Sequence, residues 1–353
     1  MAPILVTGGT GYIGTFSIVD LLEKGYDVRT TVRNLGRVDE LKKSILKLTP
    51  KLTSAQLEDK VSFYKADLTS DEGWNEAITG VEYILHVASP FPNYEPKDPN
   101  ELIVPAREGA LRVLRHAKKL GVKRVVLTSS YAAIGYGHPN GSKISEKDWT
   151  NVEKMGSAYV KSKTLAEKAA WDFINAQDHD SHALELVVIN PTGVFGPIVP
   201  GSTTSSTSTE IITKLLAGEM KYGAPKISFG LIDVRDVARI HVEAIKSEKA
   251  KGERFILVAP PKEVTLLQMA TILRQGLKSN DPRINDLPTW ELPTWLLRIL
   301  SYVVPDIKAI IGFIGVSNYY TSEKAQKVFN WTPIPPEKII LDTVASLDAE
   351  SKK

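Results

Sequence analysis

The first fourteen residues, 1–14, read MAPILVTGGTGYIG, and this stretch decides the fold. Residues 4–6 (Ile-Leu-Val) form a short apolar run that suits a strand buried on both faces. Glycines follow at 8, 9, 11 and 14, and the next apolar residues recur with the spacing of one helix stripe. Glycine permits a sharp turn and lets the backbone approach a pyrophosphate at the helix N-terminus. Strand, glycine turn and helix in this order are typical of a dinucleotide-binding fold.

Composition limits the remaining function classes. The 353 residues suffice for one large domain or two modest ones, and 42% of them are hydrophobic. A net charge of +3 without a basic patch argues against nucleic-acid and membrane partners. The chain has no cysteine, which excludes disulfides and thiolate metal ligands, and we expect no metal site. The first strand begins almost at Met1 and leaves no room for a signal peptide, so we expect a cytoplasmic protein.

Strands and helices alternate through the first half of the chain. The pattern predicts strands near 3–7, 27–32, 61–65, 82–87, 123–128 and 185–190. It predicts helices near 12–24, 36–48, 101–120 and 156–177. Such alternation indicates an α/β fold, a doubly wound parallel sheet of the Rossmann type with helices on both faces.

From about residue 192 the alternation is less regular. Residues 233–246 resemble a further helix and 254–258 a further strand, whereas Thr207-x-x-Glu210 has the spacing of a capping box at a helix start. Short helices are expected in the proline- and tryptophan-rich segments after Ala259. We therefore predict a smaller C-terminal lobe that closes over the strand ends. The predicted division assigns 1–191 and about 233–258 to the dinucleotide-binding domain, and about 192–232 and 259–353 to the substrate-binding lobe.

The end of the second predicted strand indicates the cofactor. A carboxylate at this place usually binds the ribose 2′-hydroxyl of NAD, but here Arg33 follows the strand and Arg37 comes four residues later. Guanidinium groups favour a 2′-phosphate, so we expect NADPH or NADP. Asp67 ends the third strand, where it could accept from the adenine amino group. An ordinary strand-end turn is an equally good interpretation of Asp67.

Tyr159 and Lys163 are four residues apart in a helical pattern, and they therefore share one helix face. An ammonium near a phenol stabilises the phenolate and lowers its pKa. Ser130, at the end of the fifth strand, could donate a hydrogen bond to a substrate oxygen. By itself a Tyr-x-x-x-Lys pair is often an exposed helix face, but the glycine turn and the Ser129-Ser130 strand end upstream favour catalysis.

These motifs together resemble the extended short-chain dehydrogenase/reductases. Within this family the chain is most similar to the dihydroflavonol reductases and the microbial aldehyde, ketone and methylglyoxal reductases. The matching stretches are TGGTGYIG at 7–14, ADL at 66–68, HVASP at 86–90, TSSYAA at 128–133, YVKSK at 159–163, NPTGVFGP at 190–197 and DVRDVA at 233–238. The resemblance implies an NADP-dependent oxidoreductase with Ser130, Tyr159 and Lys163 as catalytic residues. It implies cofactor contacts from Thr7, Gly8, Gly9, Thr10, Gly11, Tyr12, Ile13, Gly14, Arg33, Arg37, Asp67, Leu68, Ala88, Tyr159, Lys163, Pro191, Val194 and Ser208.

The segments that follow the strand ends are expected to line the substrate pocket. They carry aromatic and small side chains and few charges, and the candidates are Phe91, Tyr94, Tyr131 and Phe195. Trp290, Trp295 and Leu296 are candidate lid residues, although tryptophans at helical spacing are more often core. The sequence therefore predicts an NADPH-dependent carbonyl reductase for a small, largely apolar carbonyl substrate, with Tyr159 as the general acid.

Two other functions stay open at this point. A nucleotide-sugar epimerase or dehydratase would share the fold, but dehydratases place acidic residues after the catalytic Ser or Thr, and here Tyr131-Ala132-Ala133 follows. An NADP-binding regulatory protein without turnover would not need Tyr159 and Lys163. The physiological substrate and reaction direction are left open, and a monomer or a homodimer is expected.

Overall fold

The computed structural model describes residues 2–90, 96–177, 183–199, 207–261, 263–303 and 313–351. Its main feature is a seven-stranded sheet in the order β11-β6-β5-β4-β1-β2-β3, in which every neighbouring pair is parallel. The strands of this sheet are β1 (Ile4–Thr7), β2 (Val28–Val32), β3 (Val61–Lys65), β4 (Tyr83–His86), β5 (Arg124–Thr128), β6 (Glu185–Pro191) and β11 (Arg254–Leu257). The predicted doubly wound parallel sheet is confirmed.

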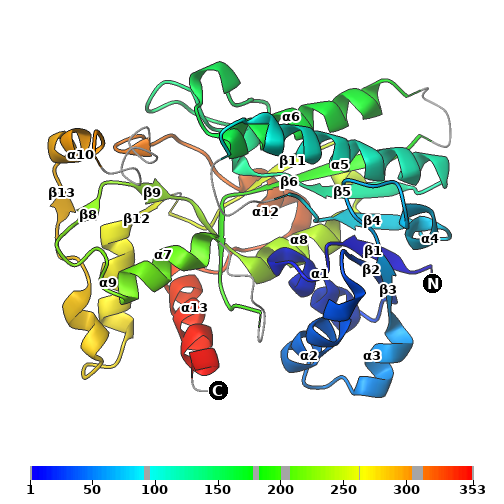
Figure 1. Cartoon of the computed structure of the whole chain (residues 1–353), viewed down its shortest axis with the longest axis horizontal. Coiled ribbons are helices and arrows are strands. Elements are labelled where there is room, and N and C mark those ends of the chain that lie inside the picture. The colour runs from blue at the N-terminus through cyan, green and yellow to red at the C-terminus, as the bar shows by residue number, and fades with distance from the viewer. Residues whose placement is uncertain are drawn as a thin grey trace.

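Helices cover both faces of the sheet. In Figure 1, α5 and α6 lie above the strands, and α1, α2 and α8 lie below them. The helices of this part are α1 (Tyr12–Glu23), α2 (Val38–Leu48), α3 (Ser54–Lys60), α4 (Trp74–Ile78), α5 (Asn100–Lys119), α6 (Ala158–Asn175) and α8 (Val234–Ala244). Strand β1 shows why both faces need cover, because Ile4 and Val6 pack into one apolar cluster and Leu5 into the other.

The predicted strands of this sheet agree with the structure to within one residue at each end. Helices α3 and α4 were not predicted. The first begins with a capping box, in which Thr53 Oγ1 accepts from Gln56 N (3.2 Å) and Gln56 Oε1 accepts from Thr53 N (2.9 Å). The second carries Trp74, which is buried and donates from Nε1 to the carbonyl oxygens of Asp67 and Ser70.

The C-terminal half adds a lobe with its own apolar cluster. Three short strand pairs form it, together with helices packed around them. Its strands are β7 (Gly193–Phe195), β8 (Ala224–Pro225), β9 (Ser228–Phe229), β10 (Leu231–Asp233), β12 (Val264–Thr265) and β13 (Glu291–Leu292). The later helices are α7 (Thr207–Leu216), α9 (Leu266–Gly276), α10 (Thr294–Leu300), α12 (Glu323–Phe329) and α13 (Pro336–Ser351). The helix predicted from Thr207 is therefore present.

One segment of the predicted lobe packs against the sheet instead. Ala325 of α12 and the following Trp331 belong to the same apolar cluster as β1 and β2. The chain thus leaves the sheet, builds the lobe and returns before α13. The division into two domains stays a prediction, and this segment would belong to the first of them.

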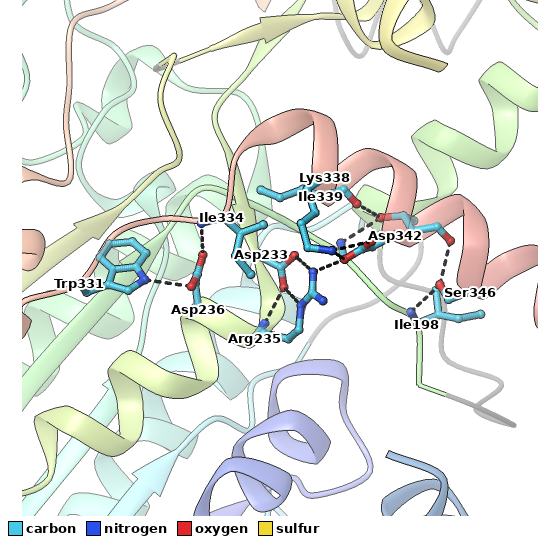
Figure 2. A network of polar contacts seen from close by, with 12 residues as sticks. Ile198, Asp233, Arg235, Asp236, Trp331, Ile334, Lys338, Ile339, Asp342 and Ser346 are labelled. Carbon is cyan, nitrogen blue, oxygen red and sulfur yellow. Dashed lines mark hydrogen bonds and ion pairs between the residues drawn. The ribbon is translucent and has the colours of Figure 1, made fainter. Parts of the chain in front are cut away.

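A polar network joins α13 to the start of α8 (Figure 2). Arg235 Nη2 lies 2.7 Å from Asp233 Oδ2 and 2.6 Å from Asp342 Oδ2. Asp236 accepts from Trp331 Nε1 (2.9 Å) and from the backbone nitrogen of Ile334 (2.8 Å). Helix α13 is therefore fixed to α8, which covers one face of the sheet.

Candidate active site

Ser130 and Tyr159 come together above the carboxyl end of the sheet. Tyr159 is the second residue of α6, and Ser130 follows β5. The Tyr159 hydroxyl lies 3.4 Å from Ser130 Oγ. Ser130 caps the 3₁₀ helix η2 (Tyr131–Ala133), and its Oγ accepts from the backbone nitrogen of Ala132 at 3.1 Å. Because Oγ accepts that hydrogen bond, its own proton is available for a substrate oxygen.

Lys163 lies one helical turn beyond Tyr159, and Lys163 Nζ donates to Ser89 Oγ at 3.2 Å. A small pocket below it is lined by Lys163, Ser89, Ala88 and His86, among others. Burial lowers the pKa of Lys163 to about 8, and the negative charge of Glu167 partly opposes this shift. Ala88, an expected cofactor contact, therefore lies at the pocket that holds Lys163.

His86 is buried beside this lysine, and its protonation state follows from its partners. Thr7 Oγ1 accepts from the backbone nitrogens of Val87 and Ala88, so its single proton points to His86 Nδ1, 2.9 Å away. Nδ1 is therefore the acceptor, and Nε2 carries the proton. Burial lowers the pKa of His86 to about 3, and Lys163 adds to the effect. His86 is neutral at ordinary pH.

The pKa of Tyr159 differs from the expectation. The sequence predicts that Lys163 lowers it, whereas burial raises the pKa of Tyr159 above its ordinary value and the hydrogen bond with Ser130 opposes this. The predicted lowering of the Tyr159 pKa is wrong for the protein without cofactor, since the Lys163 ammonium donates to Ser89. A phenol with a raised pKa is protonated near neutral pH, but it is a weaker proton donor than a free phenol.

The glycine turn has the geometry that a pyrophosphate requires. Gly8 adopts a positive φ of +71°, and a Cβ on Gly14 would lie 2.3 Å from the carbonyl oxygen of Gly8. Gly11 is the N-cap of α1 and offers no side-chain cap, so the first turn of the helix keeps its amide groups for a ligand. The predicted turn residues, from Thr7 to Gly14, run from the end of β1 into this first turn.

Arg33 and Arg37 differ in their surroundings. Arg33 follows β2 and is exposed, and within the described ranges no hydrogen bond or ion pair engages its side chain. Arg37 is paired with Glu40, which raises the pKa of the guanidinium. Asp67 accepts from the backbone nitrogen and the hydroxyl of Thr69 (2.8 and 2.7 Å), and these bonds lower its pKa. This is the strand-end turn that was the alternative interpretation of Asp67.

The predicted substrate-pocket residues have different positions. Phe91 and Tyr94 lie outside the described residues. Phe195 is fully buried in the apolar core of the lobe, so its predicted contact with substrate is wrong for this structure. Tyr131 is buried in an aromatic cluster, with its ring 4.2 Å from that of Tyr320 and 5.8 Å from that of Tyr136, centroid to centroid.

The other predicted residues are placed as follows. Pro191 ends β6, Val194 lies in β7 and Ser208 is the second residue of α7. The side chain of Leu68 lies next to Gly109 of α5. Trp290 and Trp295 are 48% and 65% exposed, so they are not core residues. Leu296 is partly exposed in α10.

Two parts of the site were not predicted. Tyr136 is electrostatically coupled to Tyr159, and burial raises the pKa of Tyr136 to about 12. Glu167 is buried on the same helix as Tyr159 and Lys163, and it accepts hydrogen bonds from Arg254 and Asn190. Its spacing of four residues from Lys163 places it on the same helix face, and this was a usable signal. Among the described residues, no group of histidine and acidic side chains is arranged to hold a metal ion.

No helix in the described part of the chain has the length and hydrophobicity needed to cross a membrane.

Comparison with known proteins identifies the family. Residues 4–258 match the NAD dependent epimerase/dehydratase family. The chain is 36% identical to a cinnamoyl-CoA reductase of Medicago truncatula, over 72% of this chain and 75% of the relative. It is 34% identical to a putative NADPH-dependent methylglyoxal reductase of Candida albicans, over 73% and 78%. The crystal structure of Gre2 from Candida albicans in complex with NADPH is similar with a TM-score of 0.79 and 28% identity, over 99% of both chains. The chain therefore belongs to the NAD dependent epimerase/dehydratase family, the extended short-chain dehydrogenase/reductases.

Proposed function

We propose that this chain is an NADPH-dependent carbonyl reductase that acts on small, largely apolar aldehydes and ketones. The observation that carries the proposal is the pairing of the Tyr159 hydroxyl with Ser130 Oγ, with Lys163 one turn away on the same helix face. The relatives named above are reductases, one of them named as NADPH-dependent.

The residues of this chain fit NADPH. The uncapped N-terminus of α1 and the close approach of Gly8 and Gly14 suit the pyrophosphate. Arg33 lies where a 2′-phosphate would need a cation, and Lys163 would bind the nicotinamide ribose. When bound, NADPH supplies the hydride that the carbonyl carbon accepts.

Tyr159 and Ser130 act on the carbonyl oxygen. Ser130 Oγ donates a hydrogen bond to this oxygen and stabilises the charge that develops on it. Tyr159 transfers its hydroxyl proton to the same oxygen as the general acid, which contributes about 10²- to 10⁴-fold. The Tyr159 hydroxyl is protonated before the transfer, because its pKa lies above the ordinary value of a phenol.

The surroundings favour an apolar substrate. Tyr131, Tyr136 and Tyr320 form an aromatic cluster next to Tyr159, and burial of apolar surface there contributes about 25 cal/mol per Å². An acidic residue that would assist a dehydratase does not follow Ser130 in the sequence. A nucleotide sugar would need cationic or backbone donors for its second pyrophosphate, and the segments after the strand ends carry no arginine cluster.

The test is NADPH consumption by the purified protein with aryl aldehydes, aryl ketones, α-keto esters, diketones and flavanonols. Turnover of at least one class, without turnover or inhibition by UDP- or GDP-sugars at about millimolar concentration, supports the proposal. NADPH binding without turnover of any carbonyl would favour a regulatory protein. Competitive inhibition by UDP-glucose at about micromolar concentration would favour an epimerase. We also propose a cytoplasmic monomer or homodimer, and light scattering after size exclusion tests the oligomeric state.

A further inference from the structure

Glu167 is a buried carboxylate directly behind the catalytic residues. It lies on α6, four residues after Lys163 and eight after Tyr159, so the three side chains share one side of the helix. The Glu167 side chain is 0% exposed. A buried charge is costly unless it is paired and hydrogen-bonded, so its partners decide what it does.

Each carboxylate oxygen of Glu167 accepts from two groups. Oε2 accepts from Ser129 Oγ at 2.5 Å and from Asn190 Nδ2 at 2.7 Å. Oε1 accepts from Arg254 Nε at 2.6 Å and from Trp171 Nε1 at 3.3 Å. The carboxylate therefore connects α6 with Ser129 just after β5, Asn190 near the end of β6 and Arg254 at the start of β11.

Asn190 extends this connection to Ser130. Its Nδ2 donates to the Glu167 carboxylate and also to the backbone oxygen of Ser130, at 3.1 Å. Ser129, the neighbour of Ser130, is held by the same carboxylate oxygen. Two short connections to the Glu167 carboxylate, one through Asn190 and one through Ser129, therefore fix Ser130 to the helix that carries Tyr159.

Arg254 fixes the loop between Ser130 and Tyr159. Its Nη1 donates to the backbone oxygens of Glu146 and Asp148, at 2.8 and 2.9 Å. The guanidinium also lies over the ring of Trp149, 3.8 Å from the centroid. The ion pair between Arg254 and Glu167 therefore holds the loop, the strand ends and the helix together.

We propose that Glu167 is a positioning residue, which holds Ser130 within hydrogen-bond distance of Tyr159 by tying both strand ends to helix α6. This inference rests on the proposed reductase function, but Glu167 itself need not contact substrate or cofactor. The negative charge of the carboxylate also opposes the effect of burial on the pKa of Lys163. Tyr159 on the same helix face and the neutral His86 are further titratable groups near Lys163.

A purely stabilising ion pair is the competing explanation, and the chain contains a matched control for it. Glu185 begins β6, at the opposite end of the sheet, and its Oε2 lies 2.6 Å from Arg124 Nη2. The two side chains are 11% and 1% exposed, so this pair is also largely buried on neighbouring strands. The pair of Glu185 and Arg124 is therefore also a buried ion pair, but it lies far from Tyr159.

The experiment compares Glu167→Gln with Glu185→Gln. Both substitutions should lower the melting temperature. Glu167→Gln should reduce kcat by about 10²-fold, because a small misplacement of reacting groups has effects of that size. Its KM for NADPH should change by less than about threefold, and kcat of Glu185→Gln should stay within about twofold of the unmodified protein. The alkaline limb of the pH profile should move to lower pH in Glu167→Gln, because Lys163 loses the neighbouring charge.

A crystal structure of Glu167→Gln with NADPH provides a readout that is independent of turnover. The distance from Ser130 Oγ to the Tyr159 hydroxyl should exceed the present 3.4 Å. An unchanged distance, an unchanged kcat or an equal loss of kcat in Glu185→Gln would overturn the inference. If Glu167→Gln does not fold, Ser129→Ala removes one of the connections and should still lower kcat, and an unaltered kcat there would contradict the proposal. Absence of turnover in the unmodified protein would instead refute the proposed function. The distance from Ser130 Oγ to the Tyr159 hydroxyl in Glu167→Gln would still test the positioning role of Glu167.

Discussion

Arg37 and Glu40 form an ion pair with two contacts, Nη2 to Oε1 at 2.9 Å and Nε to Oε2 at 3.0 Å. The guanidinium is therefore already bound to a carboxylate of its own chain. A 2′-phosphate would have to compete with Glu40 for Arg37, whereas within the described residues no hydrogen bond or ion pair engages the Arg33 side chain. The two arginines, which the sequence treats alike, should contribute unequally to cofactor selection.

The first prediction concerns this inequality. Arg33→Ala should reduce kcat/KM for NADPH by about 10- to 150-fold, since a charged hydrogen-bonded contact is worth about 1.5–3 kcal/mol. Arg37→Ala should cost less, and Glu40→Gln should improve NADPH binding by releasing Arg37. Steady-state kinetics with NADPH and NADH measure all three variants. NADH should change little, and equal losses with both cofactors would mean that Arg33 is structural.

The second prediction concerns the general acid. Tyr159→Phe should lower kcat by about 10²- to 10⁴-fold while NADPH binding, measured by fluorescence, survives. Lys163→Ala should impair both kcat and NADPH binding, because one ammonium serves both. Lys161→Ala, which removes a lysine on the same helix but off that face, is the control and should change neither. Near-normal turnover by Tyr159→Phe would refute its assignment.

The third prediction concerns the glycine turn. A Cβ on Gly14 would lie 2.3 Å from the carbonyl oxygen of Gly8, so Gly14→Ala must displace the start of α1 from the turn. Overpacking of this kind costs about 1–3 kcal/mol, and we expect NADPH affinity to fall by about 5- to 150-fold. Gly25→Ala is the control, because Gly25 has a φ of +82° but no atom within 4 Å of an added Cβ. It should lose stability and keep NADPH affinity, and a similar loss of affinity in both variants would contradict the prediction.

The fourth prediction concerns acid stability. His241 donates from Nδ1 to the backbone oxygen of Val237 and accepts from Thr128 Oγ1 at Nε2, both at 2.7 Å. Burial lowers the pKa of His241 from 6.5 to about 4 and that of His86 from 6.5 to about 3. Both histidines are neutral in the folded protein. Their contribution to the free energy of unfolding is therefore complete above pH 6.5 and is lost as the pH falls toward their pKa values in the folded protein.

The free energy of unfolding should therefore decrease below pH 6.5 by about 1.4 kcal/mol per pH unit for each of these histidines. Urea unfolding at several pH values between about 7.5 and 5 measures this slope. His241→Asn should be less stable near neutral pH and should show a shallower slope. The same slope in His241→Asn and the unmodified protein would show that His241 does not titrate in this range.

The fold was predictable because strand and helix periodicities differ clearly in the first half of the chain. Residues 4–6, for example, form an apolar run that suits a strand covered on both faces, as the structure shows. Helix α4 was missed because five residues are too few to show a period, and its position depends on Trp74, which packs on the face of the sheet that α5 and α6 cover. The return of residues 323–331 to the sheet was missed because the pattern does not show which core an apolar face joins.

The position of Tyr159 and Lys163 on one helix face was predictable from their spacing, while their catalytic roles stay a prediction. Phe195 was misplaced because the side chains of β7 alternate, and the sequence did not indicate which of them point into the lobe. The raised pKa of Tyr159 was missed because it depends on burial, which is a property of the whole fold. Arg254 was missed because it lies in β11, far along the chain from its partner Glu167.

The contact between Arg235 and Asp342 has a consequence for the synthesis of the protein. Asp342 lies in the final helix, which also supplies Ile339, Ile340 and Val344 to the apolar cluster of the lobe. A polypeptide released from the ribosome before this helix would contain every strand of the sheet and every glycine of the turn. It would nevertheless expose the apolar side chains of the lobe that α13 covers, which is the kind of surface that chaperones and proteases recognise. The sixteen-residue helix α13 is therefore needed to cover the apolar cluster of the lobe.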